Sequence, residues 1–296
     1  MELDDVFDRR RLQDLYTTLP TRDGTPYDHT PPVIPHNHLS HAPRNEHPLP
    51  HGHHLAFFHP RIAEPLLRPD GTDSTFCPPE PFVRRMWAGG RMEWLIPMKI
   101  GMEARASNEI AAVEKKGFGA EGKDKAPMVF VTQRIEMKDC GETAKSTDPY
   151  IVEERTHVYL PLGFETRRAV RKHEVPSKSD FSFTYTPTLT TLFRFSALTF
   201  NAHQIHLDKD YAQKSEGYPE RLVHAPLTAL MMLETLAFHK PDIRMKSFEY
   251  RAVNPIIINR PCTIKGVWSG TDTARLWAED PDGVVGMTGS VVFTSQ

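Results

Sequence analysis

Residues 226–238 read Pro-Leu-Thr-Ala-Leu-Met-Met-Leu-Glu-Thr-Leu-Ala-Phe, an apolar stretch interrupted only by two threonines and Glu234. Proline suits the first turn of a helix, and the apolar residues leave almost no polar face. A helix that is apolar all round must be wrapped on several sides. The stretch therefore predicts one buried helix at the centre of the fold.

Short β-like stretches lie on both sides of this helix. They are residues 92–100, 104–113, 128–137 and 150–160 before it, and 245–253, 262–268, 273–279 and 284–293 after it. The clearest alternation is in 128–137, which indicates one buried face. Consecutive strands joined by short turns pair antiparallel, so we expect an α+β fold in which an antiparallel sheet encloses the helix.

The rest of the chain divides around these elements. Residues 1–47 are predicted to be an irregular N-terminal segment, 48–170 a first unit and 180–296 a second unit, with the charged stretch 167–179 as the linker between them. The second unit is expected to open with a strand over 188–198, and helical signals follow at 208–214. A short helix is expected around 61–68.

Composition excludes several classes of function. The formal net charge is -2, and acidic and basic residues are interspersed, so no basic surface for nucleic acid is expected. No apolar run approaches the roughly 20 residues that cross a bilayer. The three cysteines are odd in number and far apart, which disfavours a disulfide framework and a paired-cysteine zinc site.

Residues 20–80 are rich in proline and histidine, including His36, His38, His41, His51 and His53. Such a tract could bind a metal ion. The histidines lack a regular ligand spacing and have no nearby cysteines to close a site, which favours an irregular covering segment instead.

The polar cluster between residues 194 and 212 is the strongest candidate for chemistry. Asn201, His203, His206 and Asp208 lie within eight residues, between the predicted strand and the helical signals. By residue type alone, a structural histidine is the commoner role for His203 or His206. A zinc site formed by His203, His206 and Asp208 is the less favoured alternative, because three ligands so closely spaced would be unusual.

The same cluster resembles the hydratase motif of MaoC-like, (R)-specific enoyl-CoA hydratases, in which an Asp is followed five positions later by a His and then, after two more, by an Asp. Asn201 stands at the position of the catalytic Asp, His206 at the catalytic His and Asp208 at the trailing Asp. The Asn form with His203 after it is similar to one branch, the mesaconyl-CoA hydratases and fungal 3-hydroxyacyl-thioester dehydratases type 2.

Two further blocks are similar to that branch. Residues 216–219 and 222–228 resemble the segment that leads into the central hot-dog helix, with Ala225 where the family has a Gly whose N–H faces the thioester oxygen. For His224 a turn residue that fixes the start of the helix is favoured over a chemical role. Residues 84–91 resemble the N-terminal repeat, where Arg85 and Trp87 could touch substrate, although an exposed charge and a buried anchor are the simpler interpretations.

The resemblance implies a double hot-dog fold, two antiparallel sheets each wrapping a central helix. Residues 48–170 would be a degenerate repeat that shapes the acyl pocket, and 180–296 the catalytic repeat. The implied reaction dehydrates a 3-hydroxyacyl thioester to the trans-2-enoyl thioester, or hydrates it in reverse. His206 would carry the proton, since an amide cannot, and Asn201 would orient water. The Ala225 N–H would hold the oxyanion, and His203, Asp208 and His224 would contact substrate.

The implied partner is an acyl thioester on coenzyme A or acyl carrier protein, with no metal or redox cofactor and with a possible homodimer. The family resemblance implies a mitochondrial location. The first twenty residues mix acids with arginines, unlike a transit peptide, so the cytoplasm is the alternative. Two other functions stay open. One is a related dehydratase or hydratase of a specialised pathway, and the other is a non-catalytic thioester-binding scaffold.

Overall fold

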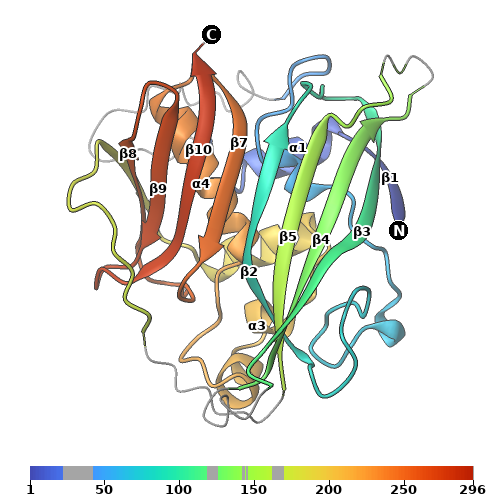
Figure 1. The fold of residues 1–296 in the computed structure, drawn as a ribbon, viewed down its shortest axis with the longest axis vertical. Helices are drawn as coiled ribbons and strands as arrows, with labels where there is room; N and C mark the ends of the chain where they lie inside the picture. Colours follow the sequence, from blue (N-terminus) through green and yellow to red (C-terminus); the bar gives the residue numbers. More distant parts are fainter. Residues whose placement is uncertain (23–42, 119–125, 142–143, 145, 162–169, 296) are drawn as a thin grey trace.

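The protein, described by a computed structural model, is built on one antiparallel sheet of ten strands (Figure 1). The structure describes all residues except 23–42, 119–125, 142–143, 145, 162–169 and 296. The strands are β1 Glu2–Val6, β2 Arg84–Trp94, β3 Glu103–Lys116, β4 Met128–Asp139, β5 Ile151–Leu160, β6 Phe181–Tyr185, β7 Ile243–Ala252, β8 Cys262–Trp268, β9 Thr273–Glu279 and β10 Val285–Ser295. Their order in the sheet is β1-β3-β4-β5-β2-β7-β10-β9-β8-β6.

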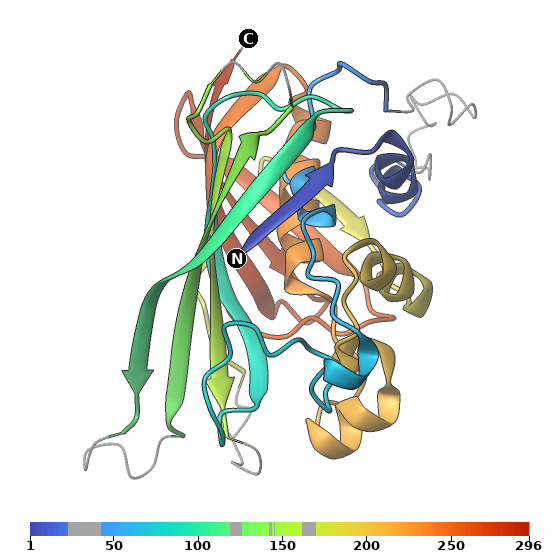
Figure 2. The ribbon, with the colours of Figure 1, turned by 90° about the vertical axis from the view of Figure 1, so that its right-hand side faces the viewer.

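The helices lie on one face of this sheet (Figure 2). They are α1 Arg9–Tyr16, α2 Leu189–Leu198, α3 Gln204–Leu207 and α4 Ala225–His239, with the 3₁₀ turns η2 His53–Ala56 and η3 Glu64–Leu66 and the π-helical turn η5 Tyr211–Ser215. In the described part of the chain, none of the helices combines the length and apolar character that a membrane span needs.

The predicted central helix is confirmed as α4. Every residue from Leu227 to Leu236 is buried, which is the consequence of an apolar surface on all sides. The helix begins at Ala225, so Pro226 takes its second position, where a missing N–H costs no hydrogen bond. The strands after the helix are confirmed too, and β8 and β9 have the predicted bounds.

The two halves of the sheet join where β2 pairs with β7. Gly89 lies opposite Arg251 and Gly90 opposite Tyr250, and a Cβ on Gly89 would stand 2.5 Å from the Tyr250 carbonyl oxygen. Glycine at this position therefore lets the two half-sheets approach and close. In the described residues the N-terminal half-sheet has no long helix of its own. Leu55 and Phe57, in and next to η2, join the same core as α4. This arrangement confirms the α+β double hot-dog fold with a degenerate N-terminal repeat. The two predicted sheets, however, form one continuous sheet, and in the described residues only the C-terminal half has the expected central helix.

The strand predicted over 188–198 is wrong, because this segment is helix α2. Thr188 caps the helix: its hydroxyl accepts from the Thr191 N–H, and the Thr191 hydroxyl in turn accepts from the Thr188 N–H. Leu192, Phe195 and Ser196 are buried on one face at helical spacing. The run of threonines suggested a strand, but the reciprocal cap and the tertiary packing decide the local structure.

The N-terminal segment is less irregular than predicted. Within 1–47, strand β1 pairs with β3, and α1 follows with Asp8 capping its first turn through the N–H groups of Arg10 and Arg11. The helix expected at 61–68 is reduced to η3, and the helical signals at 208–214 correspond to η5. The predicted linker lies partly outside the described residues, and its described part, 170–179, has no helix or strand.

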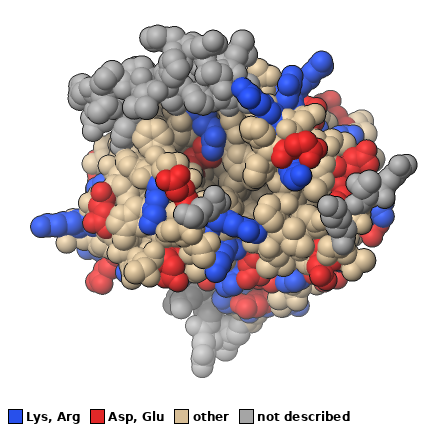
Figure 3. All heavy atoms as spheres, turned by 90° about the horizontal axis from the view of Figure 1, so that it is seen from above, with Lys and Arg blue, Asp and Glu red and all other residues tan. Residues whose placement is uncertain are grey.

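Two expectations from composition can be compared with the structure. All three cysteines, Cys77, Cys140 and Cys262, are free thiols, in agreement with the sequence, which disfavoured a disulfide framework. On the face drawn in Figure 3, acidic and basic side chains are interspersed rather than gathered by sign.

Candidate active site

Asn201 is positioned by the turn that ends α2. The Asn201 N–H donates to the Ser196 carbonyl at 2.8 Å, and the Phe200 N–H donates to the Ala197 carbonyl at 3.3 Å. These two bonds form a Schellman motif, in which Phe200 takes the left-handed position with φ 48° where glycine is usual. A strained, non-glycine turn of this kind is typical of functional sites. The chain leaves the helix with Asn201 lining a cavity.

The side chain of Asn201 is polarised by a local bond. Its Oδ1 accepts from the His203 N–H at 3.0 Å, so the amide oxygen is engaged within the loop. The amide nitrogen has no partner among the described residues. Asn201 can therefore donate to a water or hydroxyl oxygen, but it cannot take up a proton.

His206 lies in the single-turn helix α3, and a hydrogen bond to a backbone carbonyl holds its ring. Its Nδ1 lies 2.8 Å from the Leu222 carbonyl oxygen. Because a carbonyl only accepts, Nδ1 carries the hydrogen and Nε2 carries the lone pair. Burial lowers the pKa of His206 to about 4, and the Arg85 charge acts in the same direction. Near neutral pH the ring is therefore a neutral base with Nε2 as its basic atom.

His224 supports the His206 ring. The two imidazoles are stacked with centroids 3.7 Å apart, and His224 Nε2 lies 2.9 Å from the Ser196 hydroxyl. Burial keeps the pKa of His224 well below its ordinary value, and His206 and His203 lower it further. His224 also occupies the N-cap position of α4. The ring thus ties α2, α3 and α4 together, which fits the turn role favoured from the sequence.

The start of α4 offers a free donor. Ala225 is its first residue, and its N–H has no backbone acceptor among the described residues. Pro226, which follows, has no N–H and lines the cavity. A free N–H at a helix N-terminus, together with the helix dipole, favours a developing negative charge. Such a donor has the chemistry to stabilise an oxyanion, and Ala225 directly precedes Pro226, which lines the cavity.

Asp208 does not join the cavity in the described structure. Its side chain is exposed, and Oδ1 accepts from the Tyr211 N–H at 3.0 Å, so it caps the turn η5. The alternative zinc site also finds no support, because no group of three His, Cys, Asp or Glu residues that could hold a metal occurs among the described residues. Of the histidine-rich tract, His36, His38 and His41 lie outside the described residues, and His53 is buried against Glu234.

The cavity that Asn201 lines has a volume of about 520 Å³. Its walls combine the end of α2, Pro226 and the concave side of the N-terminal half-sheet. The sheet contributes Arg85, Trp87, Asn108, Gln133, Arg155 and His157. The side chains of Arg85 and Trp87 thus face this cavity, whereas the simpler sequence interpretation placed Arg85 at the surface.

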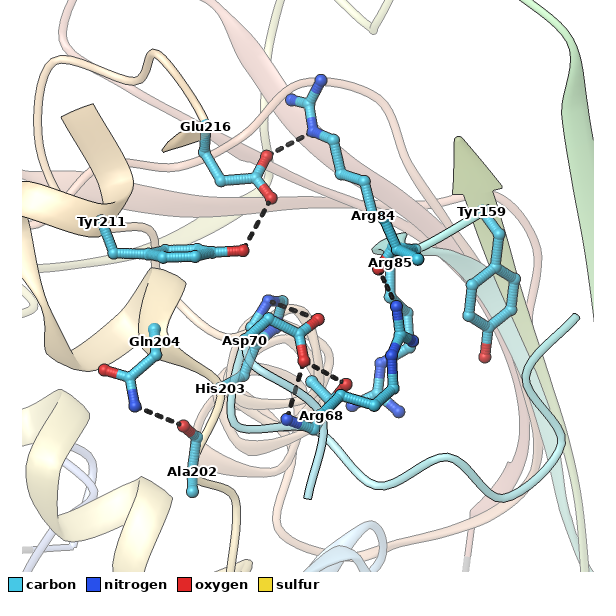
Figure 4. A network of polar contacts seen from close by, with 12 residues as sticks. Arg68, Asp70, Arg84, Arg85, Tyr159, Ala202, His203, Gln204, Tyr211 and Glu216 are labelled. Carbon is cyan, nitrogen blue, oxygen red and sulfur yellow. Dashed lines mark hydrogen bonds and ion pairs between the residues drawn. The ribbon is translucent and has the colours of Figure 1, made fainter. Parts of the chain in front are cut away.

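A loop from the N-terminal half, of which the sequence carries little indication, contacts the motif. Asp70 is 7% exposed, and its Oδ2 lies 3.9 Å from His203 Nε2 (Figure 4). The next acid in this loop, Asp73, lies 3.7 Å from Arg85. The only signal in the sequence was the turn-like run Asp-Gly-Thr-Asp at 70–73, which gives no indication of a partner so distant in the chain.

Gly71 brings this loop against the motif. Its φ is +79°, and a Cβ at this position would stand 2.1 Å from the Ala202 carbonyl oxygen. We expect Gly71→Ala to displace the loop or the motif, and to lower both the free energy of unfolding and the turnover. Gly283→Ala is the matched control, since φ there is +76° and a Cβ would have nothing within 4 Å.

Both substitutions incur the left-handed penalty of about 1 to 2 kcal/mol, and only Gly71→Ala adds the clash. Urea denaturation together with thioester turnover measures the difference. Equal losses of stability, with activity kept in both variants, would show that the contact between Gly71 and Ala202 is dispensable.

Known proteins give matches over most of the chain. Residues 52–258 match the model of the hydroxyacyl-thioester dehydratase type 2 family. A mesaconyl-C(4)-CoA hydratase of Chloroflexus aurantiacus is 35% identical over 252 residues, 84% of this chain and 85% of that protein. A mitochondrial hydroxyacyl-thioester dehydratase type 2 of Schizosaccharomyces pombe is 30% identical over 245 residues, 77% of this chain and 79% of that protein.

A solved structure supports the same fold. A MaoC-like dehydratase from Phytophthora capsici superposes with a TM-score of 0.66 at 14% identity, covering 100% of this chain and 96% of that one. At this identity the likeness shows the fold alone. The family model and the two relatives, with their coverage and identity, establish that the chain belongs to the hydroxyacyl-thioester dehydratase type 2 family.

Proposed function

We propose that this protein is a hydro-lyase that removes water from a 3-hydroxyacyl thioester, or adds it to the trans-2-enoyl thioester, with His206 as the proton carrier. The observation that most supports this proposal is the hydrogen bond from His206 Nδ1 to the Leu222 carbonyl, which leaves Nε2 as a neutral base. Membership of the family and the reactions named for its relatives support the reaction class.

We assign each step of a syn elimination to one of these groups; His206 and Ala225 directly precede Leu207 and Pro226, which line the cavity together with Asn201. The Ala225 N–H stabilises the thioester oxygen as negative charge develops, which makes the α-proton acidic. His206 Nε2 takes that proton, and the electrons of the Cα–H bond form the double bond between the α- and β-carbons. The bond from the β-carbon to oxygen breaks, and its electrons leave on the oxygen. The same proton then passes to the departing hydroxide, which leaves as water. Asn201 donates to that oxygen and holds it on the reacting face.

A group of polar side chains on the sheet side of the cavity, whose lining is otherwise mostly apolar, favours an acyl group with a polar end. Asn108 Nδ2 donates to Gln133 Oε1 at 3.2 Å, whereas Asn108 Oδ1 and His157 Nδ1 are buried without partners. An alkyl chain would displace water and leave these atoms unpaired, at about 1 to 3 kcal/mol for each. An acyl chain with a terminal hydroxyl or protonated carboxyl could donate to them, and an amide could do the same.

We therefore expect kcat/KM to be at least about tenfold higher for enoyl thioesters with a polar terminus than for alkyl thioesters of equal length. A panel of coenzyme A thioesters measures this ratio. Replacing Asn108 and Gln133 together by Leu should reduce it, because the unpaired atoms of that pair are removed. A wild-type preference for the alkyl substrates would contradict a polar acyl site, and no turnover of any member would favour the scaffold function.

The acyl carrier and the cellular location of the protein are each open to a direct test. Coenzyme A and acyl carrier protein present the acyl chain on the same phosphopantetheine arm, and turnover of matched thioesters on both carriers would separate them. Two yeast relatives are named as mitochondrial. We propose the same compartment for this protein, with the cytoplasm as the alternative, and imaging of a tagged full-length chain distinguishes the two.

A further inference from the structure

Asp70 is a buried carboxylate that the proposed mechanism does not use. Its Oδ1 accepts from the Thr72 N–H at 2.9 Å and from the Thr72 hydroxyl at 2.7 Å. Its Oδ2 is buried and has no hydrogen-bond partner. A buried oxygen without a hydrogen-bond partner lowers the stability of the folded protein, so its presence calls for a functional explanation. Since Thr72 fixes one oxygen, the direction of the other is fixed as well.

The loop that carries Asp70 is attached to the motif by backbone contacts. The Gln204 N–H donates to the Asp70 carbonyl at 2.8 Å, and Gly71 packs directly against the Ala202 carbonyl. These contacts lie on both sides of His203 in the sequence. The position of the Asp70 carboxylate relative to His203 is therefore set by the backbone of both segments.

The free oxygen of Asp70 faces a ring nitrogen that also has no partner. His203 is 5% exposed, and its buried Nε2 lies 3.9 Å from Asp70 Oδ2. The separation exceeds a hydrogen bond, but bonds of this kind are often long without substrate and tighten when it binds. The only hydrogen bond that this pair can form is from the Nε2–H to the carboxylate, provided that His203 is neutral and Asp70 is charged.

We propose that Asp70 is a positioning residue that fixes the tautomer of His203. With the hydrogen on Nε2, the lone pair of His203 is on Nδ1, where it can accept from the water or hydroxyl that Asn201 holds by donation. The carboxylate that the hydratase motif lacks at Asn201 is thus supplied by the N-terminal repeat. This inference rests on the proposed function, which assigns the reacting water to this loop.

The other groups around His203 do not offer a competing anion. His206 stands edge-to-face with ring centroids 5.5 Å away, and the Tyr211 ring lies at 6.5 Å. Burial lowers the pKa of His203 well below its ordinary value, and the further groups that lower it are His206, Arg85, Arg68 and His157. His203 is therefore neutral near pH 7, and its tautomer, rather than its charge, is what Asp70 controls.

Asp70→Asn tests this assignment because the structure dictates how the new amide lies. Thr72 donates twice to the Oδ1 position, so the amide oxygen stays there and the amide nitrogen faces His203. That nitrogen donates to Nε2 and drives the hydrogen of His203 to Nδ1, which reverses the polarity of the site. We expect kcat to fall by about 10- to 100-fold with KM little changed, as for other partners that orient a catalytic imidazole.

The direct readout is nitrogen NMR of histidine-labelled protein, which distinguishes the two tautomers. Wild type should show His203 protonated at Nε2, and Asp70→Asn should show it protonated at Nδ1 with an unchanged melting temperature. Thr72→Val removes one of the two donors that fix Asp70 but keeps the carboxylate. We expect it to keep the wild-type tautomer, with a smaller fall in kcat than in Asp70→Asn.

An unchanged tautomer in Asp70→Asn, or a kcat within about twofold of wild type, would overturn the assignment. A loss of kcat that comes with a large fall in melting temperature and no tautomer change would assign Asp70 to folding alone. The tautomer is measured without substrate. Failure of the proposed reaction would therefore appear as a lack of wild-type turnover, separate from the NMR result.

Discussion

His206→Ala should remove nearly all turnover while the protein stays folded. His206 is the motif residue whose basic atom is defined by a bond to a backbone carbonyl. General acid–base catalysis contributes about 100- to 10,000-fold, and we expect a loss of kcat within or above that range. Steady-state kinetics with an enoyl thioester measures the loss, and circular dichroism checks the fold.

The pH profile of the wild type gives an independent check on the same residue. Because His206 acts as a neutral base, kcat/KM should fall on the acidic side as the ring becomes protonated, near its pKa of about 4. His203→Ala is the matched control, and its loss should be smaller, since His203 orients the water but does not carry the proton. If His206→Ala kept more than about a tenth of the wild-type rate while His203→Ala abolished it, His203 would be the base.

Glu234→Ala should cause the largest loss of stability. Glu234 lies in the middle of α4 with its side chain 3% exposed, and it binds Arg22 at 2.9 Å and His53 at 2.9 Å. Burial alone would raise its pKa, but the Arg22 and His53 contacts lower it below the ordinary value. Breaking a buried ion pair from one side costs about 3 to 5 kcal/mol, and we expect that loss in the free energy of unfolding at neutral pH.

The pH dependence follows from the direction of this shift. A carboxyl whose pKa is lowered by folding contributes fully above its ordinary pKa, and the contribution is lost as the pH falls through the lowered value. The difference between wild type and Glu234→Ala should therefore shrink in acid. Glu249→Ala, an exposed carboxylate 4.0 Å from Arg91, is the control and should change little. Similar losses in both variants would show that the buried cluster is not a special source of stability.

The strongly patterned elements could be predicted from the sequence. The apolar helix could be predicted because a helix with almost no polar face must be buried. Strands β8 and β9 could be predicted because short turns bound them on both sides and leave few other positions for their ends. The segment 188–198 was mispredicted because its strand-like threonines form a reciprocal helix cap. That error also hid the Schellman turn that aims Asn201, which depends on where α2 ends.

The sequence points to the candidate site only as far as local spacing reaches. The motif nominates His206 and Asn201, whose catalytic roles stay predictions, and Glu234 was visible as a lone acid in an apolar helix. The partners could not be found, because Asp70 meets His203, and Arg22 meets Glu234, only through the tertiary fold. Asp208 shows the opposite case, since it has the spacing of the motif but caps the next turn at the surface.

The most direct test of hydration with His206 as the proton carrier follows where labelled water goes. The wild-type protein is incubated with a trans-2-enoyl thioester in deuterated water labelled with heavy oxygen, and the products are resolved by mass spectrometry and NMR. We expect heavy oxygen on the β-carbon and deuterium on the α-carbon with one stereochemistry, both reduced to background in His206→Ala, and an intact thioester with either protein. Heavy oxygen in a free carboxylate, or unchanged labelling by His206→Ala, would contradict this expectation.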